Sequence, residues 1–287
     1  MTATDYAYEV RETGIERLRI EIGAGLVEIV PTDGDETHAT LEVLGKASDG
    51  WVEDITFRVV GDELVVGMPP HAMRRSSEVR VRIETPGTLT ARIKTGSGDI
   101  VSKVPLKEAR LGTGSGDIRL ERSEGVLTAS TGSGDIQLES ATGPVRANTG
   151  SGGIDLRSAE ALVAASTGSG DVRIGDAAGP VTVKVGSGDI IIERVLDHSV
   201  ATSGSGDVRV ERAEGASVRA ETARGNVQVG VPAGTPTFLD LKTVTGRIQC
   251  DLEPSKQPGE GERSLVLRAR TVSGDISVVR VLKGATS

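Results

Sequence analysis

Short runs in which apolar and polar residues alternate recur along the middle of the chain. Ile118 and Leu120 flank the polar Arg119, and a few positions later Leu127 and Ala129 begin a second run of the same kind. Alternation with a period of two is typical of an extended strand that buries one face. The pattern therefore predicts two short strands, joined by turns, in each such stretch.

The two strands belong to a repeat whose most visible part is the sequence TGSGDI. Copies of this motif start at steps of eighteen residues, at Thr95, Thr113, Thr131, Thr149, Thr167, Val185 and Ser203. Degenerate copies start at Thr222, Thr243 and Thr271, and an early copy spans residues 22–29, where Leu26 replaces the aspartate. Because a strand-turn unit of this size cannot bury its apolar side alone, we expect the copies to stack.

The predicted fold is all-β, a single-chain β-solenoid (β-helix) with about 18 residues and two main strands per coil. Each strand should pair with its equivalent one coil away, about 4.8 Å distant. Three regions are expected: an irregular N-terminal β cap with degenerate first coils over residues 1–94, regular coils over 95–221, and degenerate coils over 222–287 with a loop insertion near 254–263. Aromatic residues make up only 2% of the chain, so Val, Ile, Leu, Ala and Thr must fill the core.

The TGSGDI motif has the residues of a tight corner. Gly114 and Gly116 permit backbone conformations that other residues avoid, and Asp117 can accept backbone N–H bonds where the chain enters the strand. Thr113 is expected to be partly buried at the corner, where the threonine hydroxyls of successive coils form a ladder. Stacked aspartates repel one another, and turn amides or neighbouring arginines such as Arg119 would offset that repulsion.

These motifs resemble those of a known family. The succession TGSGDI, TGSGDV, TARGNV and TVSGDI, with the tail FLDLKTVTGRIQCDLEPSKQPGEGERSLVLRARTVSGDI, is similar to a bacterial β-strand-repeat family of unknown function whose members are provisionally described as adhesins. The likeness is strongest to leaderless actinobacterial-type members and covers about residues 15–281. It implies a β-solenoid. The first thirty residues contain no signal-peptide pattern, so a cytoplasmic location is expected.

Composition and motif content argue against several functions. A net charge of −8 and few aromatic side chains disfavour nucleic acid as a partner, and no apolar run is long enough for a membrane helix. His38, His71 and His198 lie at unrelated positions of the repeat, so no enzyme is expected. We single out no catalytic, cofactor-binding or metal-binding residue and expect no cofactor. Cys250 is interpreted as a small strand residue.

Calcium binding is an alternative, because calcium-binding β-rolls also have eighteen residues per coil and aspartates in their turns. Two features of the sequence speak against it. The second turn of each coil, as in ERSEG or ESATG, lacks a repeated aspartate, and Gly153 interrupts the aspartate column. A calcium-binding β-roll-like module nevertheless stays a distinct alternative.

The expected function is a non-catalytic cytoplasmic β-solenoid that acts as an interaction or self-assembly scaffold, with an adhesin-like surface-binding module as a further alternative. The partner would be another protein or a second copy. It would meet either the flat sheet face formed by outward residues such as Thr128 and Arg146, or a solenoid edge left open by the C-terminal segment DISVVRVLKGATS.

Overall fold

The computed structural model describes residues 4–44, 51–69, 78–215, 217–252 and 264–282. These residues form 27 strands and one short 3-10 helix. The chain divides into two compact units, Met1–Gly150 and Ser151–Ser287. No helix in the described ranges is long and apolar enough to cross a membrane.

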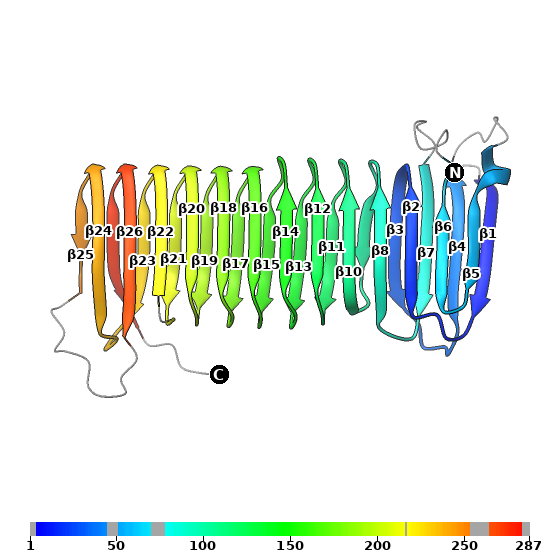
Figure 1. The fold of residues 1–287 in the computed structure, drawn as a ribbon, viewed down its shortest axis with the longest axis horizontal. Helices are drawn as coiled ribbons and strands as arrows, with labels where there is room; N and C mark the ends of the chain where they lie inside the picture. The colour runs from blue at the N-terminus through cyan, green and yellow to red at the C-terminus, as the bar shows by residue number, and fades with distance from the viewer. Residues whose placement is uncertain (1–3, 45–50, 70–77, 216, 253–263, 283–287) are drawn as a thin grey trace. The chain divides into compact units, whose positions relative to one another are not determined.

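Unit 1 contains strands β1 to β14 and the 3-10 helix η1 (Figure 1). Their bounds are β1 Thr4–Glu12, β2 Arg17–Ile22, β3 Ala24–Pro31, β4 Thr37–Leu44, η1 Trp51–Asp54, β5 Thr56–Val60, β6 Glu63–Gly67, β7 Glu78–Thr85, β8 Leu89–Thr95, β9 Asp99–Ser102, β10 Leu106–Thr113, β11 Ile118–Ser123, β12 Leu127–Thr131, β13 Ile136–Ala141 and β14 Val145–Thr149.

The strands of unit 1 form two stacks of paired neighbours. One stack has the order β13, β11, β9, β3, β7, β4, β1, and the other has the order β14, β12, β10, β8, β2, β6, β5. The pairs β7–β4, β4–β1 and β6–β5 are antiparallel, whereas the other pairs in the two stacks are parallel. The unit is thus a parallel solenoid whose first coils are covered by antiparallel strands.

Those antiparallel strands close the start of the core. The Tyr8 hydroxyl of β1 donates to the Val52 carbonyl of η1 at 2.6 Å, and the Tyr8 ring lies 6.0 Å from the Phe57 ring of β5. Val52 and Ile55 are buried beneath them. The expected β cap is therefore present, and the contact between the Tyr8 and Phe57 rings links its two stacks.

Unit 2 contains strands β15 to β27. Their bounds are β15 Ile154–Ala159, β16 Val163–Ser169, β17 Val172–Ala177, β18 Val181–Ser187, β19 Ile190–Val195, β20 Ser199–Ser205, β21 Val208–Ala213, β22 Ser217–Arg224, β23 Val227–Pro232, β24 Thr237–Thr245, β25 Ile248–Cys250, β26 Leu265–Ser273 and β27 Ile276–Val281.

The last coils of unit 2 are stacked out of sequence order. β22 pairs with β26 and β26 with β24, while β23 pairs with β27 and β27 with β25. The final strands thus lie between two earlier coils, as Figure 1 shows for β26 between β22 and β24. The expectation that the C-terminal segment leaves a coil edge open is wrong for Ile276–Val278, because β25 pairs with these residues from the outer side. We call β24 and β25 the terminal coil.

The eighteen-residue register is confirmed in each unit. In unit 1, Ile118 pairs with Ile100 before it and Ile136 after it, and all three are buried. Arg119 next to it is partly exposed, as the alternation predicts. Leu26 pairs with Asp99, which confirms the alignment of the early motif copy. The all-β solenoid is therefore confirmed, whereas the regional boundaries after residues 94 and 221 stay predictions.

Candidate functional site

The threonine of each TGSGDI motif joins two coils. Thr131 is buried, and its Oγ1 donates to the Gly116 carbonyl of the previous coil at 2.9 Å while accepting from the Gly134 amide at 3.0 Å. Thr113 makes the same pair of bonds one coil earlier, to Gly98 and from Gly116. The expected burial is confirmed. The motif hydroxyls nevertheless bond to glycine backbone, not to one another as expected.

The glycines of the motif are required by close stacking. A Cβ atom on Gly116 would lie 2.1 Å from the Gly98 carbonyl oxygen one coil away, far inside van der Waals contact. Gly188 meets the same restriction and also has a φ of 143°, a conformation that L side chains rarely adopt. The repeated glycines therefore allow the corners of successive coils to stack closely.

The aspartates form a hydrogen-bonded ladder. The Asp117 amide donates to Asp99 Oδ1 at 2.9 Å, and the Asp135 amide donates to Asp117 Oδ1 at 2.9 Å. Arg119 Nη2 contacts Asp117 Oδ2 at 2.5 Å. Amide donors and the guanidinium offset the repulsion between stacked carboxylates, since bonds to the charged form stabilise it.

A ladder of the same kind starts at Asp171 in unit 2 and ends in the terminal coil. The Asp189 and Asp207 amides each donate to the aspartate one coil earlier at 2.8 Å. Asn226 continues the ladder to Asp275, and the Arg247 amide donates to Asp275 Oδ1 at 2.8 Å. Arg247 offers no carboxylate to a further coil, so the ladder stops there.

This bonding explains the aspartate column without a cation. One oxygen of each of six ladder carboxylates accepts a backbone N–H, in Asp99, Asp117, Asp171, Asp189, Asp207 and Asp275. Ca²⁺, by contrast, takes six to eight oxygen ligands. Throughout the described parts of the chain, no group of three or more His, Cys, Asp or Glu side chains is arranged to hold a metal ion. The geometry gives the column a structural role.

The terminal coil exposes the end of the core of unit 2. Leu239 and Leu241 of β24 stand in register with Leu267 and Ala269 of β26, which are fully buried, yet both leucines are only half-buried. In β25, Ile248 pairs with the buried Ile276 but is 47% exposed. Within the described ranges, no strand pairs with the outer edge of β24 or β25. Core-facing side chains therefore lie uncovered by described residues.

Cys250 of β25 is exposed for the same reason, because no described strand lies beyond the terminal coil. It lies in a strand, as expected, and stands in register with the fully buried Val278. Its side chain is exposed because it belongs to the outermost coil. A free cysteine usually lies buried, so this exposure is a further sign of an uncovered core.

The outer face of the terminal coil is also apolar at its ends. Phe238 and Val244 are 67% and 68% exposed, and Val266 and Val272 of the adjacent β26 are exposed beside them. Between them, Asp240 accepts from Arg268 Nε at 2.9 Å and from Arg270 Nη2 at 3.0 Å. The hydrogen bond from Arg270 is the main cause that holds the pKa of Asp240 below its usual range, and the bond from Arg268 adds to it. The surface combines large apolar side chains with a few charges.

Comparison with known proteins places this geometry in a family. The model of the Toastrack DUF4097 family matches residues 9–179 and again residues 163–279. The chain belongs to the Toastrack family. No functionally curated protein matches its sequence.

Solved structures resemble this Toastrack chain along most of its length. A provisionally named lipid-binding protein from Parabacteroides distasonis is 14% identical, with 96% of each chain covered and a TM-score of 0.41. Provisionally named adhesins from Bacteroides fragilis and Parabacteroides merdae are 12% and 11% identical, with TM-scores of 0.34 and 0.36. Coverage is 97% of this chain and 98% of the first adhesin, and 96% and 95% for the second. These likenesses are too distant to carry a functional argument.

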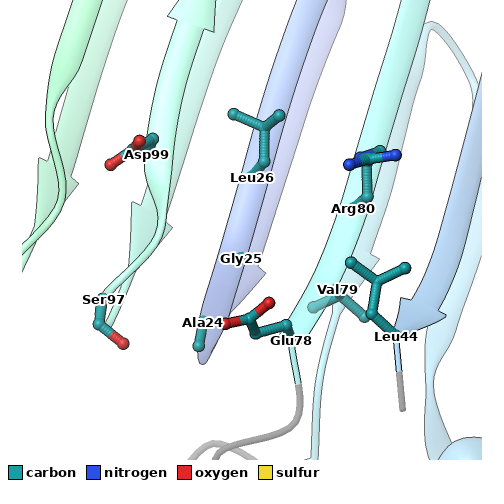
Figure 2. A pocket seen from close by; sticks show the side chains of 9 residues that line it. All are labelled: Ala24, Gly25, Leu26, Leu44, Glu78, Val79, Arg80, Ser97 and Asp99. Carbon is teal, nitrogen blue, oxygen red and sulfur yellow. The ribbon is translucent and has the colours of Figure 1, made fainter. Parts of the chain in front are cut away.

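A surface hollow lies in each unit of the Toastrack chain. The hollow in unit 1 has a volume of about 290 Å³, and Figure 2 shows Leu26, Arg80 and Asp99 around it. Two of its charged groups have structural partners, since Asp99 accepts from the Asp117 amide and Arg80 lies 4.0 Å from Glu42. The hollow in unit 2, of about 490 Å³, lies over β20, β22, β26 and β24 and includes Val244 and Lys242. It extends the apolar surface of the terminal coil.

The two described histidines of the Toastrack chain, His38 and His198, are partly exposed and exposed, respectively. His38 Nε2 is 3.0 Å from Glu9, and His71 falls outside the described residues. His198 Nδ1 is 2.8 Å from the Ser217 hydroxyl, and its Nε2 is 3.7 Å from Asp197. This serine, histidine and aspartate set was not anticipated from the sequence, because Ser217 comes from the next coil. The aspartate lies beyond hydrogen-bond distance and the histidine side chain is 63% exposed, so the set lacks the geometry of a catalytic triad.

Proposed function

We propose that this Toastrack chain is a non-catalytic interaction module that binds a protein partner through the terminal coil of unit 2. The observation that carries the proposal is the uncovered core column, in which Leu241 and Ile248 stand in register with fully buried residues of the coil beneath. An exposed strand edge combined with exposed apolar side chains is a favoured site for adding another strand.

The flat face considered from the sequence is a weaker candidate. Its outward residues lie at the surface as expected, but they are polar or small, as at Thr128, Arg146 and Lys184. Burying such residues gives little hydrophobic stabilisation. Binding through the terminal coil instead covers large apolar side chains and satisfies open backbone groups together. The cytoplasmic location expected from the N-terminal sequence stays a prediction.

Site-specific photo-crosslinking in the native cell tests this function. A photoreactive phenylalanine analogue replaces Phe238 in the terminal coil and, as a matched control, Thr128 on the flat face of unit 1. We expect a discrete protein adduct from position 238 and none from position 128. Equal labelling at both positions, or none at 238, would contradict the proposed function. The mass of the adduct reports what the partner is.

A further inference from the structure

We propose that the terminal coil binds a second copy of itself, with β24 pairing antiparallel to the partner's β24. This inference rests on the proposed function, because it identifies the partner of the same surface. Its basis is the sequence of β24, TFLDLKTVT, considered together with the direction of its backbone groups and the side chains that it exposes.

The outer edge of β24 presents backbone groups in the order that such pairing requires. The Leu265 amide of β26 donates to the Pro236 carbonyl at 2.9 Å, so the even-numbered residues of β24 direct their peptide groups toward β26. Alternation directs the N–H and C=O groups of Leu239, Leu241 and Thr243 toward the outer edge. Two strands centred on Leu241 then exchange hydrogen bonds through these odd-numbered residues.

Centring the pair on Leu241 makes the strand complementary to itself. Asp240 lies opposite Lys242 of the second copy, so each symmetric pair of strands gains two contacts between opposite charges. Phe238 lies opposite Val244 of the second copy, which brings together the two most exposed apolar side chains of β24. Cross-strand pairs of both kinds stabilise antiparallel sheets.

Neighbouring registers are worse. Centring on Asp240 places that carboxylate opposite its own copy, and centring on Lys242 does the same with two ammonium groups. A shift by one residue would face the half-buried Leu239 and Leu241 outward, because side chains alternate between the two faces. The Leu241 register alone among these keeps core residues inward and opposite charges together.

Other occupants of the edge fit less well. The chain segment that follows the terminal coil, EPSKQPGEGER over residues 253–263, contains no large apolar side chain to cover the leucines. A further parallel coil would lack a ladder partner, because Arg247 stands where the other coils have Asp or Asn. A two-fold axis across the end of unit 2 avoids both problems and carries β25 onto its copy as well.

Charge exchange on the full chain tests the pairing by sedimentation velocity over a concentration series. We expect the parent protein to be a dimer. Lys242→Glu and Asp240→Lys each place like charges opposite one another, so each should raise the dimer dissociation constant roughly tenfold or more. An equimolar mixture of the two variants should recover the dimer, because the mixed pair again has opposite charges at both contacts. Arg209→Glu, an outward charge reversal in the interior strand β21, should leave the dimer unchanged.

A second pair of variants keeps the test valid if Asp240→Lys fails to fold after losing its arginine partners. Phe238→Glu and Val244→Lys leave Asp240 intact, should each weaken the dimer, and should associate with one another. A parent that stays monomeric at every concentration, or charge variants that dimerise like the parent, would overturn the pairing. Binding of the monomer to anionic phospholipid vesicles, without dimers, would overturn it too.

The two experiments separate the two proposals. If the parent is monomeric and position 238 crosslinks to a different protein, self-pairing is wrong and the binding function of the terminal coil stands. If position 238 gives no adduct, the binding function itself fails. An adduct of twice the chain mass supports both.

Discussion

The first coils of unit 1 and the last coil of unit 2 end the same kind of solenoid in opposite ways. At the start of unit 1, antiparallel strands lie over the core, and Tyr8, Phe57 and Val52 close the space between the two stacks. At the end of unit 2, Leu239, Leu241 and Ile248 occupy equivalent inward positions without a described strand beyond them. The last coil of a solenoid exposes core side chains and a strand edge, so each end must be covered by cap strands or by a binding partner.

The difference also shows how sequence regularity relates to exposure. The covered end is irregular in sequence, and its Tyr8 and Phe57 are partly buried, whereas the open end keeps a recognisable repeat motif and exposes Phe238 and Val244. Each regular coil has a strand edge that pairs with the next coil. A regular coil at the end of the stack therefore exposes an unpaired strand edge. Matched substitutions at the two ends measure this difference.

The largest expected difference is between two leucine-to-alanine substitutions. Leu41 of β4 is fully buried between β1 and β7, so Leu41→Ala should lower the free energy of unfolding by about 2–5 kcal/mol. Leu241→Ala, at a half-buried inward position, should cost under about 1 kcal/mol in the monomer because little surface is lost from a packed core. Denaturant unfolding at low protein concentration measures both. Equal losses would contradict the contrast between the ends.

A smaller difference is expected for two threonines. The Thr37 and Thr85 hydroxyls are buried 3.1 Å apart at the covered end, so Thr37→Val should cost about 1–3 kcal/mol by leaving a buried hydroxyl unpaired. Thr243 of the terminal coil makes one bond, to the Gly274 carbonyl, where water has access. Thr243→Val should therefore cost less, about 1 kcal/mol or below. Thermal unfolding monitored by circular dichroism ranks the two; the reverse order would show that the open end is already covered.

A still smaller change in stability is expected for a substitution at Gly153, which lies in a regular coil away from the terminal coil. Gly153 has no side chain to offer the Asp171 amide one coil later, so Gly153→Asp would supply the missing acceptor. The gain and the added carboxylate repulsion should nearly cancel, leaving a change of about 1 kcal/mol or less. Calorimetry with and without Ca²⁺ should give the same melting temperature. A calcium-dependent rise of several degrees would establish the calcium-binding alternative instead.

The smallest effect concerns the pH dependence of the open end. Arg270 and Arg268 lower the pKa of Asp240 in the folded chain, so its contribution to stability is present above the pKa of an unfolded aspartate, about 3.9. That contribution is lost as the pH falls through the lower folded value. Asp240→Asn should therefore be slightly less stable than the parent at pH 6 and equally stable at strongly acidic pH. A difference that grows toward acidic pH would be the wrong sign.

Much of the fold could be predicted because the repeat period determines the register. Eighteen residues separate Ile100, Ile118 and Ile136, and they stack as the period requires. The early copy was also found from pattern alone, since Leu26 aligns with Asp99. Alternation likewise separates the buried Ile118 from the partly exposed Arg119.

The candidate site could not be predicted as fully, because stacking order is a property of distant pairings. The motif copies at Thr243 and Thr271 are each compatible with following β23, and the sequence order alone does not choose between them. A signal was nevertheless present. Val244 is a large apolar residue at an outward position where the regular coils carry glycine, as at Gly168, Gly186 and Gly204. This replacement is the sequence feature that distinguishes the outer face of the terminal coil.

The inserted strands impose an order on synthesis and folding. Residues 237–250 leave the ribosome before residues 265–281, yet in the described structure they join the stack only through them. Ser217 of β22 pairs with Val266 of β26, 49 positions later in the sequence. The growing chain can therefore add its coils one at a time only as far as β23. The last two coils cannot reach their native order until residues 265–281 have been synthesised, and a ribosome stalled before residue 265 would hold a chain whose β24 lacks its native neighbour β26.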